Sequence, residues 1–199
     1  VDRWSGADRF ATSAAISAQT YSPGVGTAFI ASGRVFTDAL SGAPVAGKLG
    51  GPVLLVDTNS LPSVIAAELR RLRPGRVVVL GGPATISDAV FNELKTFARQ
   101  AERWSGDDRF TTSVAITHKS YAPGVGPLYV ASGRVYTDAL SGAPVAGMTK
   151  GPVLLVDTTS IPSAVAAEIT YLKPGRIVIL GGPATVSTGV QAQLATYLP

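Results

Sequence analysis

The sequence contains no cysteine and only one histidine among its 199 residues. Without cysteine the chain forms no disulfide, holds no cysteine-ligated zinc and performs no thiol catalysis. A single histidine, His118, provides no cluster of the side chains that transition metals prefer. We therefore expect no metal site and no cofactor.

Charged side chains are also scarce, at 15% of the residues against about 25% in typical soluble domains. The 17 basic and 13 acidic residues leave a net charge of +4, which suits an acidic partner. No run of lysine and arginine marks a nucleic-acid-binding arm. No apolar stretch approaches the ~20 residues of a membrane helix, so we expect neither a nucleic-acid partner nor a membrane span.

The dominant feature of the sequence is a repeat. At an offset of 100 residues the two halves align without a gap, and about 61 of 99 aligned positions are identical. A period of this length indicates duplication of a whole small domain, so we predict domains at 1–100 and 101–199. The junction at 99–102 lacks proline, glycine and serine, and we expect the copies to dock against each other.

Short apolar runs alternate with helical patterns inside each copy. In the first copy they predict strands over 28–31, 53–56 and 77–80, and helices over 12–21, 37–49, 62–72 and 87–97. Pro44 is expected to kink or break its helix. A further short strand is expected at 3–5, and in the second copy at 102–104. The predicted fold class is α/β, with two tandem Rossmann-like domains, each a small parallel sheet flanked by helices.

Loops that follow the strands of a parallel sheet emerge at one edge, where ligands normally bind. Two arginines of each copy lie in such loops, namely Arg9, Arg34, Arg109 and Arg134. The planar fork of arginine suits phosphate and carboxylate groups, so these side chains could form an anion site. Alternatively they pair with Asp8, Asp38 or Asp57 and brace the loops. Arg76 and Arg176 follow Pro-Gly and are predicted to enter strands at the opposite edge.

The aspartates of this edge have structural interpretations. Asp38 and Asp138 open a helix, where an acidic residue caps free N–H groups and complements the helix dipole. Asp57 and Asp157 follow a strand, and a turn role is favoured over a place in a catalytic pair. Ser87 and Ser187 are predicted to cap the last helix of each copy.

Two further features argue against catalysis. The segment Gly81-Gly82-Pro83-Ala84-Thr85 joins a strand to a helix but matches no phosphate-binding fingerprint, and Pro83 removes an N–H. His118 aligns with Ala18 and so belongs to no repeated site. We expect it on the surface, which leaves no Ser-His-Asp triad.

These segments resemble a known repeat family. Residues 3–13 are similar to the opening R-x-x-G-x-D-R-(Y/F)-x-T-(A/S) of the cell wall binding repeat 2 family. Residues 31–44 resemble its S-G-x-x-x-x-D-A-L-x-x-x-P segment, 51–55 its P-(I/V)-L-L strand, and 79–87 its L-G-G-x-x-x-(I/V)-S turn. The same blocks recur 100 residues later, so the resemblance covers the chain twice.

The resemblance implies a secreted, non-catalytic module of Gram-positive surface proteins. Such a module holds a passenger domain on the wall by binding anionic secondary polymers, either teichoic-acid-like or polysaccharide. The family usually has three repeats packed in a triangle, with the polymer in grooves along the repeat junctions. Here there are two, so a third was lost or cut away, two suffice, or chains associate to complete the array. Trp4 and Trp104, where aliphatic residues are more usual, are either core residues or platforms that stack on sugars.

Two alternatives remain open at this stage. The chain could be an enzyme that processes wall sugars with Asp8, Asp38 or Asp57 as acid and base. Paired carboxylates about 5–10 Å apart would support that chemistry. It could also be a structural unit of a surface layer that associates with copies of itself.

Overall fold

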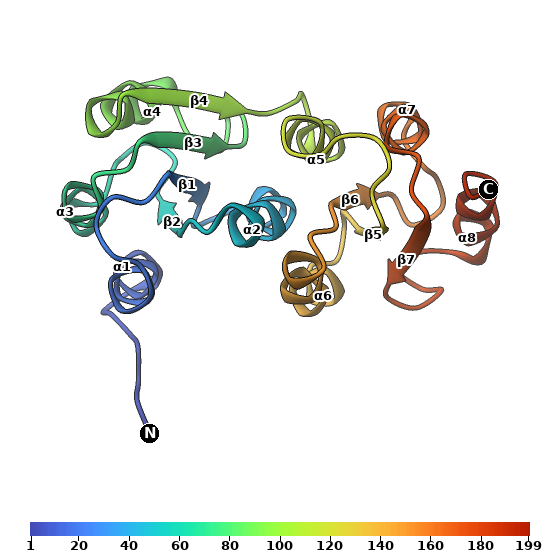
Figure 1. Ribbon diagram of the computed structural model, residues 1–199, viewed down its shortest axis with the longest axis horizontal. Helices are drawn as coiled ribbons and strands as arrows, with labels where there is room; N and C mark the ends of the chain where they lie inside the picture. Colours follow the sequence, from blue (N-terminus) through green and yellow to red (C-terminus); the bar gives the residue numbers. More distant parts are fainter. The chain divides into compact units, whose positions relative to one another are not determined.

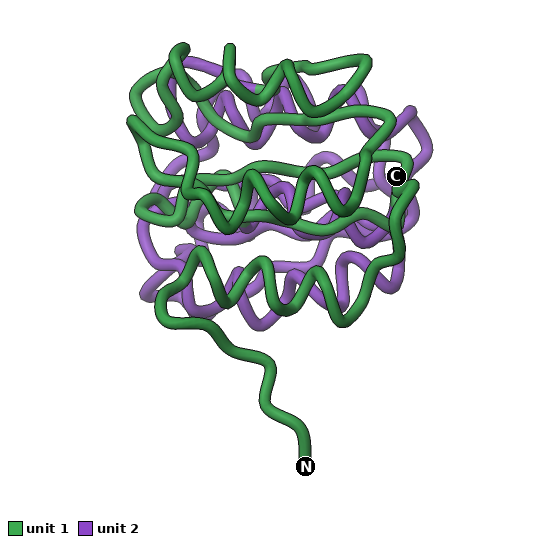
Figure 2. The backbone as a smooth tube through the Cα atoms, turned by 90° about the vertical axis from the view of Figure 1, so that its left-hand side faces the viewer, with its two compact units in different colours: residues 1–39, 49–104 green, residues 40–48, 105–199 purple.

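A computed structural model describes residues 1–199. The chain divides into two compact units, shown in green and purple in Figure 2. The first unit comprises residues 1–39 and 49–104, and the second comprises 40–48 and 105–199. None of the helices combines the length and the apolar character that crossing a bilayer requires.

The elements follow each other in the predicted alternation (Figure 1). The first repeat contains α1 (Arg9–Thr20), β1 (Thr27–Ser32), α2 (Thr37–Leu49), β2 (Val53–Val56), α3 (Ser63–Leu72), β3 (Arg76–Leu80), α4 (Asp88–Leu94) and the 3-10 helix η1 (Lys95–Phe97). The second contains β4 (Gln100–Trp104), α5 (Arg109–His118), β5 (Pro127–Ser132), α6 (Thr137–Met148), β6 (Val153–Val156), α7 (Ser163–Leu172), β7 (Arg176–Leu180) and α8 (Thr188–Ala195).

The strands form two parallel sheets, as the apolar runs predict. The first sheet has the order β2-β1-β3-β4 and the second the order β6-β5-β7. All pairings are parallel, so the loops that follow the strands of one sheet share an edge. The α/β fold class is therefore confirmed.

The apolar side chains of the first sheet lie in a core beneath α1, α3 and α4. In α3, Ile65, Leu69 and Leu72 recur at helical spacing and are 0% exposed. They meet β-strand residues such as Ile30 and Val79. This core fixes the direction of the strands and thereby the edge on which the polar loops gather.

The strand predicted at residues 3–5 is wrong. This segment forms no helix or strand and is exposed, and in Figure 1 it runs away from α1. The matching segment of the second copy does form a strand, β4, but it pairs with β3 of the first sheet, with Arg76 opposite Gln100 and Leu80 opposite Trp104. A strand needs a neighbour for its backbone hydrogen bonds, and residues 3–5 have none.

Of the two outcomes predicted for Pro44, a kink or a break of its helix, the break is wrong. Helix α2 continues through Pro44, and α6 continues through Pro144. The first helix also begins earlier than its apolar pattern suggests, at Arg9, because the Asp8 carboxylate accepts a hydrogen bond from the Ala11 N–H at 2.7 Å. This N-cap satisfies one of the donors at the helix start.

Candidate ligand-binding site

The carboxyl edge of the first sheet is organised by the start of α1 and the loops after β1 and β2. Arg9 donates from Nη1 to the Gly33 carbonyl at 2.7 Å. Gly33 is required there, because a Cβ would lie 2.6 Å from the Phe10 ring. Arg109, Gly133 and Phe110 repeat this arrangement in the second unit, with the same 2.7 Å hydrogen bond.

Arg34 pairs with Asp57 through both arms of its fork. Its Nε and Nη2 lie 2.8 and 2.7 Å from the two carboxylate oxygens, and Arg134 binds Asp157 with distances of 3.3 and 2.7 Å. The pairing joins the loops after β1 and β2, so the loop-bracing interpretation is confirmed for these arginines.

The pairing also fixes the charge of the carboxylate. The hydrogen bonds from Arg34 and from the Thr58 N–H lower the pKa of Asp57 to about 2, and the same contacts lower the pKa of Asp157. Asp57 thus stays ionised at neutral pH and has the turn role that the sequence favours.

Two features of the paired arginines leave donors for a ligand. Arg34 remains 61% exposed and Arg134 56% exposed, and Nη1 of each has no hydrogen-bond partner among the contacts above. Arg9 and Arg109 each use one N–H for a carbonyl, which leaves Nε and Nη2. The edge of each unit therefore holds two oriented guanidinium groups with unused N–H donors.

Asp38 and Asp138 lie in the first turns of α2 and α6, where their charge complements the helix dipole. Asp138 is not the N-cap, because α6 begins after Tyr136, whose side chain makes no capping hydrogen bond. Its Oδ2 accepts instead from Thr185 Oγ1 at 3.2 Å, and the Asp38–Thr85 pair is 3.5 Å apart. Asp38 is only 4% exposed, so it supports the edge from beneath.

An exposed aromatic residue, which the sequence patterns did not single out, follows Arg34 and Arg134 two positions later in the chain. Phe36 is 38% exposed and Tyr136 is 46% exposed. The signal that marks them is an aromatic residue at the same position of both copies, in the loop that contains Ser-Gly-Arg. An aromatic face offers a large apolar surface with a defined orientation.

The two tryptophans have different environments. Trp104 is 3% exposed, and its ring meets Phe29 edge-on at 6.0 Å between centroids. The core interpretation is therefore confirmed for Trp104, which no polymer reaches. Trp4 is 50% exposed, so the core interpretation is wrong for it.

The remaining candidates have the structural roles that were predicted. Arg76 and Arg176 are the first residues of β3 and β7, at the edge opposite the arginine pairs. Ser87 and Ser187 cap α4 and α8. The His118 side chain is 55% exposed and lies 3.1 Å from the Glu168 carboxylate.

Comparison with known proteins agrees with this architecture. The family model for Cell wall binding domain 2 (CWB2) matches residues 3–91 and again residues 103–191. Among solved structures, Cwp6 from Clostridium difficile superposes with a TM-score of 0.89 at 27% identity, covering 98% of this chain and 31% of that one. Cwp8 from Clostridium difficile gives 0.87 at 28% identity, covering 98% and 33%.

Two curated relatives come from Bacillus subtilis (strain 168). The chain is 30% identical to an amidase enhancer over 195 residues, which are 97% of this chain and 26% of that protein. It is 28% identical to the N-acetylmuramoyl-L-alanine amidase LytC over 194 residues, covering 98% and 38%. The chain thus spans between a quarter and two fifths of the relatives' length. Since the family match covers both repeats, the chain belongs to the Cell wall binding domain 2 family.

Proposed function

We propose that the chain is a non-catalytic anchoring module that binds an anionic polymer of the cell wall at the carboxyl edge of each sheet. The observation that carries this is the same arrangement built twice, with two oriented arginines and one exposed aromatic residue in the loop that contains the second of them. Each repeat, 1–100 and 101–199, acts as one binding unit. The protein works outside the cell, on a Gram-positive surface, and holds a passenger there.

The chemistry of the edge suits a polymer that carries phosphate or carboxylate groups. Arg9 and Arg109 offer the most unused N–H donors and contact the acidic group, while the arm that binds the Gly33 or Gly133 carbonyl keeps each guanidinium in place. Arg34 and Arg134 add an exposed Nη1 each. The rings of Phe36 and Tyr136 receive the apolar face of a sugar.

Catalysis with the aspartates of the edge is disfavoured by their contacts. Asp8 caps α1, Asp38 is buried beside Thr85, and Asp57 is held ionised by Arg34. Asp57 in particular has a lowered pKa, the opposite of what a general acid requires. Turnover of peptidoglycan or a glycoside that disappears in Asp38→Asn or Asp57→Asn would contradict the non-catalytic role.

The first test measures binding to purified wall sacculi before and after removal of their anionic polymers. Wild-type protein should co-sediment with intact sacculi and lose this binding after stripping. Replacing both Arg9 and Arg109 by alanine should weaken binding more than either single change. The matched control replaces Lys95 and Lys119, two exposed cations away from the edge. If the control loses binding and the Arg9/Arg109 variant keeps it, the site assignment is wrong.

Salt provides an independent prediction. Single exposed ion pairs contribute on the order of 0–1 kcal/mol, so retention must come from both repeats acting together. We expect wall binding to weaken steadily between low salt and 1 M NaCl, because the Debye length falls to about 3 Å. Retention that does not change over this range would indicate apolar or purely hydrogen-bonded recognition.

A further inference from the structure

The loops that precede the strands of the first sheet line a groove of about 770 Å³. Its walls are the loop at 24–26 before β1, the end of α3 with the turn at 73–75 before β3, and residues 96–99 before β4. Since these three strands are neighbours in a parallel sheet, the groove lies at its amino edge, opposite the edge that holds Arg9 and Arg34. This hollow is termed the amino-edge groove.

Three arginines line the amino-edge groove, and no acidic residue does. They are Arg70, Arg73 and Arg99, and all three are exposed. The guanidinium of Arg70 lies 5.4 Å from the centre of the Phe97 ring, which lines the groove as well. The groove therefore combines a concentrated positive charge with one aromatic face.

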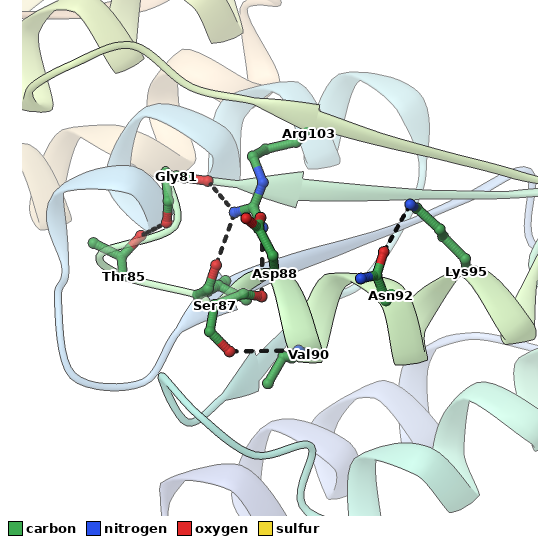
Figure 3. A network of polar contacts seen from close by, with 10 residues as sticks. Gly81, Thr85, Ser87, Asp88, Val90, Asn92, Lys95 and Arg103 are labelled. Atoms are coloured by element: carbon green, nitrogen blue, oxygen red, sulfur yellow. Dashed lines mark hydrogen bonds and ion pairs between the residues drawn. The ribbon is translucent and has the colours of Figure 1, made fainter.

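The other cations of the first unit already have acceptors. Arg103 donates to the Gly81 carbonyl at 2.9 Å and lies 3.2 Å from the Asp88 carboxylate (Figure 3). Lys95 donates to Asn92 at 2.8 Å, as the same view shows. Acceptors also hold Arg9, Arg34, Arg71 and Arg76. Apart from Arg3, the arginines of the amino-edge groove are thus the cations of this unit whose side chains have neither a hydrogen bond nor an ion pair.

The end of α3 accounts for only part of this charge. Arg70 lies in the last turn of α3 and Arg73 at its C-cap, where a cation complements the helix dipole. Arg99 is outside this helix, between η1 and β4. Arg73 also has a left-handed backbone with φ of 47°, a conformation for which a helix end usually takes glycine. The groove thus carries more positive charge than the helix end explains.

Backbone carbonyls beside the groove are occupied, so they do not repel an anion strongly. The Leu72 carbonyl at the end of α3 accepts from the Gly24 N–H at 2.6 Å. The Val25 carbonyl accepts from the Gly75 N–H at 3.0 Å. An anion that enters the groove therefore meets unused guanidinium N–H donors.

We propose that the amino-edge groove is a second anion-binding site, which takes the phosphate groups of a phosphodiester-linked chain. The planar fork of an arginine binds two oxygens of one phosphate, and several forks in one groove suit successive phosphates of a chain. Phe97 and Val25 receive the sugar or polyol between the phosphates. The proposal rests on the proposed function only for the source of the chain, which is the polymer of the cell wall.

The second repeat does not carry this site. Lys173 keeps the charge of Arg73 and has the same φ of 47°. Thr170 and Pro199, however, stand in place of Arg70 and Arg99. The two repeats therefore contact the polymer unequally, the first at both edges of its sheet and the second at one.

Calorimetric titration with a short, soluble glycerol phosphate oligomer tests the proposal. The titrated protein is the full chain with Arg9→Ala and Arg109→Ala, which removes the main donors of the carboxyl edge and leaves the groove. Adding Arg70→Thr and Arg99→Gln should weaken the remaining binding at least about tenfold, a loss of about 1.4 kcal/mol. Lys95→Ala is the matched control, because this cation of the same unit already has an acceptor, and it should leave binding unchanged. Unchanged binding after the two groove substitutions would overturn the proposal.

Backbone amide signals in NMR spectra locate the bound oligomer without relying on affinity. In the wild type, the signals of Arg73 and Gly75 should shift on titration, and those of Gly33 and Arg34 report separately on the carboxyl edge. Shifts at Gly33 and Arg34 alone would overturn the groove site and leave the proposed function standing, whereas shifts at Arg73 and Gly75 alone would do the reverse.

Two further probes fix the chemical class of the ligand. A polyglutamate chain of equal charge should bind the groove more weakly than the glycerol phosphate oligomer does. Equal or tighter binding of polyglutamate would overturn the assignment to phosphate. Shifts at Arg73 and Gly75 with phosphatidylglycerol vesicles, but not with the soluble oligomer, would also overturn the proposal and indicate that the groove meets a membrane surface.

Discussion

At the scale of single residues, the two repeats hold the same buried glutamate in different ways. Glu68 accepts from Ser17 at 2.6 Å and from both arms of Arg71 at 2.7 Å. Glu168 has only His118, at 3.1 Å, and its second oxygen is buried without a hydrogen-bond partner. Both oxygens of Glu68 accept hydrogen bonds, whereas one oxygen of Glu168 loses its contact with water on folding and gains no hydrogen bond in return.

This difference predicts a pH-dependent stability. Burial raises the pKa of Glu168, and the His118 hydrogen bond offsets this only in part. A raised folded-state pKa means that the contribution to stability is present below the unfolded value of about 4.3 and is lost as the pH rises through the folded value. Relative to Glu168→Gln, the wild type should therefore lose free energy of unfolding between acidic and neutral pH. Urea denaturation of both proteins from pH 4.5 to 7.5 measures this, and parallel curves would contradict it.

At the scale of elements, the turn after β3 lies close to Asp38 and Thr85. Gly81 has φ of 107°, in the region that favours glycine. A Cβ at this position would overlap both Asp38 Oδ2 and Thr85 Oγ1. The turn thus requires glycine for its backbone conformation and for the closeness of its neighbours.

Gly81→Ala should lower the free energy of unfolding by more than the roughly 1–3 kcal/mol that an unfavourable backbone conformation alone costs. Gly24→Ala is the matched control, because Gly24 has φ of 91° with no atom near its hypothetical Cβ. It should show the conformational cost only. Equal losses in the two variants, measured by thermal or urea unfolding, would show that the contacts with Asp38 and Thr85 are unimportant.

The sequence predicts the elements well where local pattern decides them. The strand at 53–56 and the helix at 37–49 have the predicted bounds, because a short apolar run and a run of small residues that opens with Thr-Asp are local signals. The strand at 3–5 fails because pairing depends on a neighbour that the local pattern cannot reveal. The Arg34–Asp57 pair could be named only as one of several options, since its partners are 23 residues apart and meet through the sheet.

At the scale of the whole molecule, the sequence repeat and the folded sheet have different boundaries. The repeat restarts at residue 101, yet residues 100–104 complete the first sheet. A fragment that ends with the first repeat therefore exposes β3 and loses the Trp104 contact with Phe29.

A fragment of residues 1–106 should be more stable than one of residues 1–99. The expected difference is about 3 kcal/mol or more, the usual cost of removing a buried tryptophan. Both fragments lack the rest of the second repeat, so the comparison isolates β4. Circular dichroism during thermal unfolding measures the difference, and equal midpoints would contradict the role of β4 in the first sheet.

The offset between repeat and sheet also bears on how such genes change length. Recombination between two near-identical blocks adds or removes a unit of one hundred codons, wherever the crossover falls within the block. Because each block supplies the last strand of the sheet before it, every internal sheet of the altered product is completed automatically. Repeat number can therefore vary in evolution without leaving an internal sheet incomplete.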